Sequence, residues 1–253
     1  MNQLNKPPIY ALHGTASSGA QWADLSSACL GKRHVITPDL PGYGQMQNVQ
    51  EHGFEKRLQP LIADFLAINS QAHLVGHSFG AALVLRLAEM YPDRCLSVTL
   101  YEPTYLGVFW NNTRPNDVML FRQIEALAKA VEVASPIEAM SYFIDFWMGK
   151  NRWQTLSLPA KQTLSGYAKL TAQDFSDGLF EASHSSTHAP YTGPTKLIYG
   201  ENTAAIAKRI CQLLAEKMPN ACVEQLAGLG HMGPLQDPKT VNQVIINHIE
   251  KIE

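Results

Sequence analysis

Short apolar segments bounded by turn residues recur along the chain, and most are separated by stretches in which apolar residues follow the helical period. The predicted strands are Ile9–Leu12, His34–Thr37, His73–Val75, Leu96–Tyr101, Lys196–Tyr199 and Val223–Leu226. The predicted helices are Gln21–Leu30, Phe54–Ile68, Gly80–Met90, Ala204–Lys217 and Pro238–Ile249. Regular alternation of strands and helices is typical of a mostly parallel sheet covered by helices. The pattern therefore predicts an α/β fold of about six strands.

The alternation stops between Thr104 and Pro190, where only helical patterns occur. These patterns cover Asp117–Val133, Pro136–Met148 and Pro159–Gln173. More than half of the aromatic residues of the chain lie between Tyr101 and Phe180, which is under a third of its length. They either form the interior of an insertion or line a pocket, and the sequence leaves both open. We therefore predict an α/β core at residues 1–103 and 191–253, with a helical cap at residues 104–190.

The composition of the 253 residues narrows the classes of partner. Twenty Lys and Arg residues nearly balance 22 Asp and Glu residues, and no run of five like charges occurs, so nothing favours binding of nucleic acid or of an anionic membrane. No apolar run approaches the length of a membrane span, and the first residues show no signal-peptide pattern. The cysteines lack CxxC spacing, and we expect them to be reduced. We therefore expect a cytoplasmic protein that acts on a small molecule. The oligomeric state is left undetermined.

The segment Gly76–Gly80, with the sequence GHSFG, lies directly after a predicted strand and directly before a predicted helix. This context is typical of a nucleophile elbow, in which a serine on a sharp turn is exposed at the carboxyl edge of the sheet. Small residues two positions before and after the serine allow the sharp turn, and the N-terminus of the following helix favours negative charge. We therefore predict that Ser78 is a catalytic nucleophile.

A second turn with a glycine, His13-Gly14-Thr15, follows the first predicted strand. Glycine lets the backbone approach closely enough for an N–H group to point into the site. Together with the elbow, this turn predicts an oxyanion hole made by the backbone N–H groups of Thr15 and Phe79. We expect His13 to make structural hydrogen bonds, and Asp39, which lies in a turn before the elbow, to be structural as well.

The segment Gly228–Gly233, with the sequence GLGHMG, follows the last predicted strand. A histidine in this loop can reach the serine from another strand, so His231 is the predicted base. The same residues match the GxGxxG dinucleotide fingerprint, but no further strand follows to complete a βαβ unit. His184 and His188 have the spacing of one helix face, but no third ligand lies near them. We therefore predict no metal and no cofactor.

Taken in order, the segments HGTASSGAQW, PDLPGYG, GHSFG, LIYGE and GLGHMGP resemble motifs of the α/β-hydrolase family, specifically its small bacterial-type members with a helical cap. The resemblance extends over nearly the whole chain. It begins at the third of the usual eight strands, which implies that the first two are absent. It also implies a triad in the order serine, acid, histidine, and it carries Ser78 and His231 over directly.

The position of the acid departs from the family pattern. The family commonly has an Asp after the next-to-last strand, but Thr203 stands at that position. Relatives that move the acid place it after the strand that follows the elbow, where this chain has Glu102, which we expect Pro103 to hold extended. Adjacent parallel strands lie about 4.8 Å apart, so either loop brings a carboxylate near the histidine. We predict Glu102 as the acid, and the alternatives are Glu201, a cap residue such as Asp145, or a dyad without an acid.

These residues predict a serine hydrolase of the carboxylesterase type, which cleaves a small or medium apolar or aromatic ester through an acyl-enzyme. A serine nucleophile argues against dehalogenase and epoxide hydrolase chemistry, which needs a carboxylate nucleophile. The same triad could act on a carbon–carbon bond, a lactone or a thioester. The fold could also serve as a receptor or scaffold that binds a ligand without turnover.

Overall fold

The computed structural model describes residues 6–49, 51, 53–184 and 189–253. In this part of the chain, six parallel strands form one sheet in the order β2-β1-β3-β4-β5-β6. The strands are β1 (Ile9–Leu12), β2 (Val35–Ile36), β3 (Ala72–His77), β4 (Cys95–Tyr101), β5 (Thr195–Gly200) and β6 (Ala221–Leu226). Each strand lies where the hydrophobic pattern predicts one, and the predicted fold class is confirmed.

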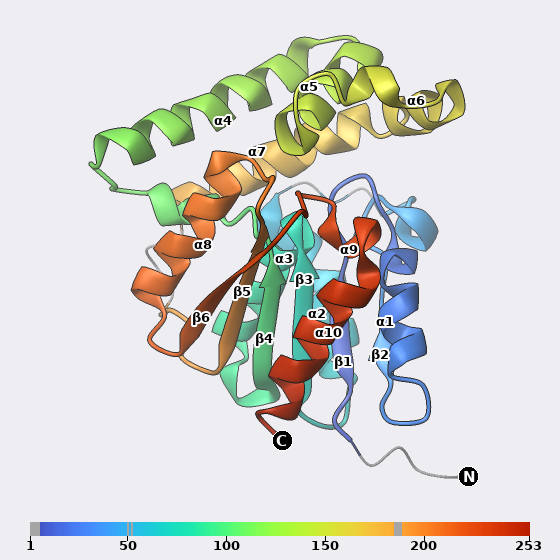
Figure 1. The fold of residues 1–253 in the computed structure, drawn as a ribbon, viewed down its shortest axis with the longest axis vertical. Helices are drawn as coiled ribbons and strands as arrows, with labels where there is room; N and C mark the ends of the chain where they lie inside the picture. The colour runs from blue at the N-terminus through green and yellow to red at the C-terminus, as the bar shows by residue number, and fades with distance from the viewer. Residues whose placement is uncertain (1–5, 50, 52, 185–188) are drawn as a thin grey trace.

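Helices cover both faces of the sheet (Figure 1). One face carries α1 (Ala23–Ala28) and α10 (Pro238–Glu250), which the short α9 (Gly233–Gln236) precedes, and the other carries α2 (Phe54–Leu66), α3 (Ser78–Met90) and α8 (Ala205–Lys217). Along β1, Ile9 and Ala11 pack on the α10 side, whereas Tyr10 and Leu12 pack on the α3 side. Successive strand residues point to opposite faces, so a continuous apolar run indicates a strand buried on both sides.

Four further helices lie between β4 and β5 in the chain and sit together above the carboxyl ends of the strands (Figure 1). They are α4 (Pro115–Val133), α5 (Pro136–Met148), α6 (Leu158–Ser165) and α7 (Ala168–His184). The prediction of a single helix at Pro159–Gln173 is wrong, because the chain turns at Gly166 and Tyr167 and α7 then continues to His184. Glycine is a poor helix former, which favours a break at Gly166, although α7 contains Gly178 without one. The exact cap boundaries at residues 104 and 190 stay a prediction.

The cap packs on core helices, with α7 against α2 and α4 against α8. Its buried aromatic residues belong to the same hydrophobic cluster as the core helices, and they include Phe109, Phe143, Trp147, Trp153 and Phe175. No helix in the described ranges has the length and apolarity that crossing a membrane requires.

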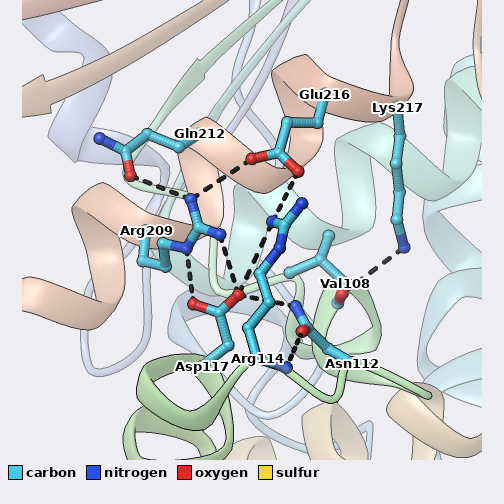
Figure 2. A network of polar contacts seen from close by, with 8 residues as sticks. All are labelled: Val108, Asn112, Arg114, Asp117, Arg209, Gln212, Glu216 and Lys217. Atoms are coloured by element: carbon cyan, nitrogen blue, oxygen red, sulfur yellow. Dashed lines mark hydrogen bonds and ion pairs between the residues drawn. The ribbon is translucent and has the colours of Figure 1, made fainter.

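A polar network joins the start of α4 to α8 (Figure 2). The buried carboxylate of Asp117 accepts hydrogen bonds from Arg209 Nε at 2.6 Å and from Arg209 Nη2 at 2.8 Å. Asn112 donates to the same carboxylate at 2.8 Å, and Arg114 pairs with Glu216 at 2.8 Å nearer to solvent. This network attaches the first cap helix to the core.

A second link, which is fully buried, joins α7 to α2. Arg57 Nη1 lies 2.5 Å from Asp174 Oδ1 and 3.0 Å from Asp177 Oδ2, and all three side chains are almost inaccessible to solvent. Arg57 Nη2 also donates to the carbonyl of Pro41. The cap is thus held at both ends, by a partly exposed network at α4 and by a buried one at α7.

Candidate active site

The elbow forms where β3 ends and α3 begins. Ser78 has a φ of +53°, in the left-handed region that is strained for a residue with a side chain. A Cβ atom at Gly76 would lie 2.5 Å from the Cα of Ala81, and one at Gly80 would lie 2.2 Å from the carbonyl oxygen of His13. Neither position has room for a side chain, so the two glycines allow the turn that holds Ser78 at the carboxyl edge of the sheet.

His231 lies in the loop between β6 and α9, and its ring bridges the other two residues predicted for the triad. Its Nε2 lies 3.0 Å from Ser78 Oγ, and its Nδ1 lies 2.7 Å from Glu102 Oε2. All three residues are buried, with exposed fractions of 4% or less. In this arrangement the Nδ1–H group donates to the carboxylate, which leaves Nε2 free to accept the serine proton.

The backbone of Glu102 differs from the expectation. Pro103 was expected to keep this residue extended, but its φ is +46°, so that expectation is wrong. The turn is supported from β5, because Gly200 N donates to Glu102 Oε1 at 2.8 Å and Thr203 Oγ1 donates to Glu102 Oε2 at 2.5 Å. These hydrogen bonds offset the backbone strain and aim the carboxylate at His231.

Thr203 is a residue of this site that the sequence argument left without a role. It occupies the position where the family commonly has its Asp, and its hydroxyl binds the carboxylate that lies on the neighbouring strand end. The sequence shows a residue with a hydroxyl group at the position where the family commonly has its Asp. That this hydroxyl reaches Glu102 is shown only by the structure, in which the loop after β5 lies against the end of β4.

The other carboxylates considered from the sequence bind backbone groups elsewhere. Glu201 accepts from Gly228 N at 2.9 Å, and its side chain is exposed. Asp145 accepts from Trp153 N at 2.7 Å in the turn after α5. Asp39 accepts from two backbone N–H groups, each at 2.7 Å. None of them has a hydrogen bond to His231 among the described residues.

Two buried side chains hold the histidine loop. His77 Nε2–H donates to the carbonyl of His231 at 2.9 Å, and the Tyr101 hydroxyl donates to the carbonyl of Gly230 at 2.7 Å. Burial, followed by the charge of nearby His231, holds the pKa of His77 well below its usual range. These two residues directly precede Ser78 and Glu102, so the strands that end at those residues also position the loop that carries His231.

The cap contributes an aromatic side chain that covers His231. The indole of Trp147 in α5 stacks on the imidazole of His231, with ring centroids 4.6 Å apart and planes 25° apart. The ring of His77 lies 5.1 Å away from the same imidazole. The aromatic enrichment of the insertion therefore serves both of the uses that the sequence left open, since Trp147 belongs to the core cluster and also lines the cavity beside Ser78.

A small cavity, with room for little more than a water molecule, lies between the cap helices and Ser78. Thr15 and Phe79, the predicted oxyanion-hole residues, both border it. The rest of its lining is mostly apolar and comprises Thr104, Leu106, Ile124, Phe143, Trp147, Thr171, Asp174, Phe175 and Gly178. An apolar cavity with a few polar groups beside a nucleophile is typical of a substrate pocket.

The carboxylate of Asp174, which was not among the predicted site residues, ties one wall of this cavity to the turn that carries Thr15. Asp174 Oδ2 accepts a hydrogen bond from Thr15 Oγ1 at 2.5 Å and another from the Tyr43 hydroxyl at 2.7 Å. Its Oδ1 binds Arg57, which supplies the compensating charge. A cap helix therefore contacts the turn that carries Thr15.

His13 occupies a structural position, as expected. Its Nδ1–H donates to the carbonyl of Gly14 at 2.8 Å, and its Nε2 accepts from Leu40 N at 2.9 Å. Burial lowers the pKa of His13 to about 4, so the ring is neutral near pH 7. The His13 ring therefore joins the turn that carries Thr15 to the loop after β2.

Metal and dinucleotide binding have no support in the described residues. Within the described ranges, no three His, Cys, Asp or Glu side chains lie close enough together to hold a metal ion. His188 lies outside the described residues, and the side chain of His184 is not described either. The GLGHMG loop follows β6, and the described residues after it form helices and a final turn, so it has no βαβ unit.

The chain belongs to the α/β-hydrolase fold family, whose model matches residues 7–238. It is 23% identical to monoacylglycerol lipase ABHD6 from Mus musculus, over 98% of this chain and 77% of that protein. It is 25% identical to the pimeloyl-acyl-carrier-protein methyl ester esterase from Aeromonas hydrophila, over 94% of each. A solved hydrolase structure from Oleispira antarctica has the same fold, with a TM-score of 0.72, 17% identity, and coverage of 97% of this chain and 92% of that one. These relationships support a hydrolase in general terms.

Proposed function

We propose that this protein is a serine hydrolase that cleaves a small or medium, largely apolar carboxylic ester through an acyl-enzyme. The observation that carries this proposal is the hydrogen-bond chain from Ser78 through His231 to Glu102 beside the apolar cavity. A receptor that only binds a ligand does not need this chain, whereas nucleophilic catalysis does. The ester hydrolases among the relatives support the same class of reaction.

In the first half of the reaction, Ser78 Oγ attacks the carbonyl carbon while its proton moves to His231 Nε2. The Glu102 carboxylate stabilises the imidazolium through Nδ1–H. The tetrahedral intermediate then collapses, the bond from carbon to the alcohol oxygen breaks, and the leaving alcohol takes the proton from Nε2. In the second half, water attacks the acyl-enzyme with the same proton movements and releases the acid.

The negative oxygen of the intermediate would accept hydrogen bonds from the backbone N–H groups of Thr15 and Phe79. Phe79 follows Ser78 at the N-terminus of α3, where unpaired N–H groups and the helix dipole favour negative charge. Thr15 borders the cavity, and its hydroxyl donates a hydrogen bond to the carboxylate of Asp174. All of these groups belong to the chain itself, so the mechanism requires no metal or organic cofactor.

The substrate is expected to be compact. The cavity beside Ser78 is small, with room for little more than a water molecule, so substrate binding requires the cap helices to move, and a compact ester requires the smallest movement. Both the aliphatic and the aromatic side chains of the cap border the cavity, which favours an apolar acyl or alcohol group.

The test combines a fluorophosphonate probe with a set of p-nitrophenyl esters of increasing chain length. We expect the wild-type protein to be labelled at Ser78, to hydrolyse the short esters fastest, and to lose turnover by about three to six orders of magnitude in Ser78→Ala. The alanine variant should keep the wild-type melting temperature within a few degrees, because alanine fits the elbow. Absence of labelling would favour a receptor, and turnover of a thioester, lactone or diketone in place of the esters would move the activity to that bond.

A further inference from the structure

One face of the cap helix α7 forms a wall of the cavity. Thr171, Asp174, Phe175 and Gly178 all line it, and their spacing of three, four and seven residues places them on the same side of the helix. Two of the four residues, Thr171 and Asp174, have polar side chains. Only Asp174 has hydrogen-bond partners for its side chain among the described residues.

The carboxylate of Asp174 is fully engaged by Thr15, Tyr43 and Arg57. The side chain of Thr171 is completely buried, and its hydroxyl has no hydrogen-bond partner among the described residues. Threonine in a helix often donates its hydroxyl to the carbonyl four residues earlier, which here belongs to Tyr167. That carbonyl accepts the backbone N–H of Thr171 at 2.8 Å, and the Thr171 hydroxyl makes no hydrogen bond to it. Buried hydroxyl groups are nearly always hydrogen-bonded, because an unmade hydrogen bond costs free energy.

The surroundings of this hydroxyl define what could bind it. The neighbouring lining is apolar, with Leu106, Ile124 and Phe143 from the cap segment and Phe175 one turn along α7. No Lys or Arg lines the cavity, and a carboxylate lies on the same helix face. An anionic group is therefore disfavoured, whereas a neutral oxygen fits, since a hydroxyl group both donates and accepts.

From these contacts we infer that Thr171 is a specificity-determining residue that hydrogen-bonds a hydroxyl or keto oxygen of the substrate. The substrate class is then a short, otherwise apolar ester with one neutral oxygen function a few bonds from the scissile carbonyl. This inference rests on the proposed ester hydrolase function of the same site. The oxygen can belong to the acyl or to the alcohol portion, and the experiment separates these two sources.

The experiment measures kcat/KM for matched esters. The acyl arm compares methyl butanoate with methyl 3-hydroxybutanoate and methyl 3-oxobutanoate, and the alcohol arm compares propyl butanoate with 2-hydroxyethyl butanoate. We expect the wild-type protein to prefer the oxygenated ester about tenfold in one arm, which corresponds to one neutral hydrogen bond. Thr171→Ser, which retains the hydroxyl, should keep this ratio, and Thr171→Val, which has the same shape without it, should bring the ratio close to one.

The ratio is used because any general effect of a substitution on turnover cancels from it. A ratio that survives in Thr171→Val, or no preference in either arm, would overturn the inference. Hydrolysis of the plain esters tests the proposed function separately, and failure of every ester would overturn that function together with the inference that depends on it.

The melting temperature of the free protein gives a second readout that needs no substrate. Thr171→Val removes an unpaired buried hydroxyl, so it should melt at or above the temperature of the wild-type protein. A clearly lower melting temperature would mean that the hydroxyl has a structural partner, and the inference would fail.

Discussion

Glu102 shows how much of this site depends on single hydrogen bonds. Its side chain is completely buried, and it is surrounded by the donors Gly200 N, Thr203 Oγ1 and His231 Nδ1. A buried carboxylate without such donors would cost several kcal/mol, and the positive φ of this residue adds strain. The three donors compensate the burial of this carboxylate, and its part in the reaction is a prediction that substitution tests.

Replacement of Glu102 by Gln should lower kcat by about three to four orders of magnitude, because a neutral amide can hold the imidazole in the wrong tautomer. The control is Glu201→Gln, whose exposed side chain accepts a hydrogen bond from Gly228 N in the loop after β6, and it should change kcat by less than about twofold. Steady-state kinetics on the best p-nitrophenyl ester distinguishes the two. Equal activity of Glu102→Gln and wild type would remove Glu102 from the mechanism.

Thr203 offers a rescue experiment. Its Oγ1 lies 2.5 Å from the Glu102 oxygen that binds His231, so a carboxylate introduced at residue 203 would lie close to the same imidazole. We expect kcat of the double variant Glu102→Gln, Thr203→Asp to be at least about ten times that of Glu102→Gln alone. Thr203→Asp alone should be less active than wild type, because two buried carboxylates would repel each other. No recovery in the double variant would show that the loop after β5 cannot present an acid in this fold.

At the scale of the elements, the cap and the core are joined by two polar networks that differ in exposure. The link between α7 and α2 is buried, whereas the Arg114–Glu216 pair in the network between α4 and α8 faces solvent (Figure 2). Exposed ion pairs contribute little to stability because water screens them, but breaking a buried pair leaves a charge without compensation. The two ends of the cap should therefore respond differently to substitution.

Arg57→Met should reduce the free energy of unfolding by about 3–5 kcal/mol, since it leaves Asp174 and Asp177 buried without a cation. Glu216→Gln removes one partner of an exposed pair and should leave the free energy of unfolding nearly unchanged. Urea denaturation followed by circular dichroism measures both. Similar small losses in the two variants would contradict the assignment of the α7 link as the stronger attachment.

At the scale of the whole molecule, buried histidines make stability depend on pH. Burial lowers the pKa of His13, His73 and His248 to about 4, and it holds that of His77 well below the usual range. An unfolded chain has histidine pKa values near 6.5, so between about pH 4 and 6.5 the unfolded state binds more protons than the folded state. The stabilisation by the neutral rings is complete above pH 6.5 and is lost as the pH falls through this window.

The free energy of unfolding should therefore rise steadily from pH 4 to pH 6.5 and then level off, with several protons taken up on unfolding at pH 5. His248→Gln should reduce the slope of the free energy of unfolding against pH by the equivalent of about one proton. The reason is that His248 is buried with a lowered pKa, and its Nδ1 has no partner among the described residues. The exposed His34 provides the matched control, and His34→Gln should leave the slope almost unchanged. Urea titrations at half-unit pH intervals give the slopes, and a flat profile over this range would contradict the prediction.

The six strands, the elbow at Gly76–Gly80 and the helical nature of the insertion could be predicted because each is set by local chemistry. A run of apolar residues between turns must be buried on both faces of a sheet, and the glycines around Ser78 permit only a narrow range of turns. The candidate residues Ser78 and His231 were found in the same way, since each lies in a short motif directly after a strand. Their catalytic roles stay predictions.

Contacts between distant segments were decided by tertiary packing alone. The left-handed turn of Glu102 and the hydrogen bond from Thr203 depend on two strand ends that are about a hundred residues apart in the chain. The stacking of Trp147 on His231 and the exact position of the unpaired Thr171 hydroxyl depend on how the cap sits over the sheet. A periodic pattern states which face of a helix is buried, but it does not state which residue will lie opposite, because that choice is made by the packing of whole elements against one another.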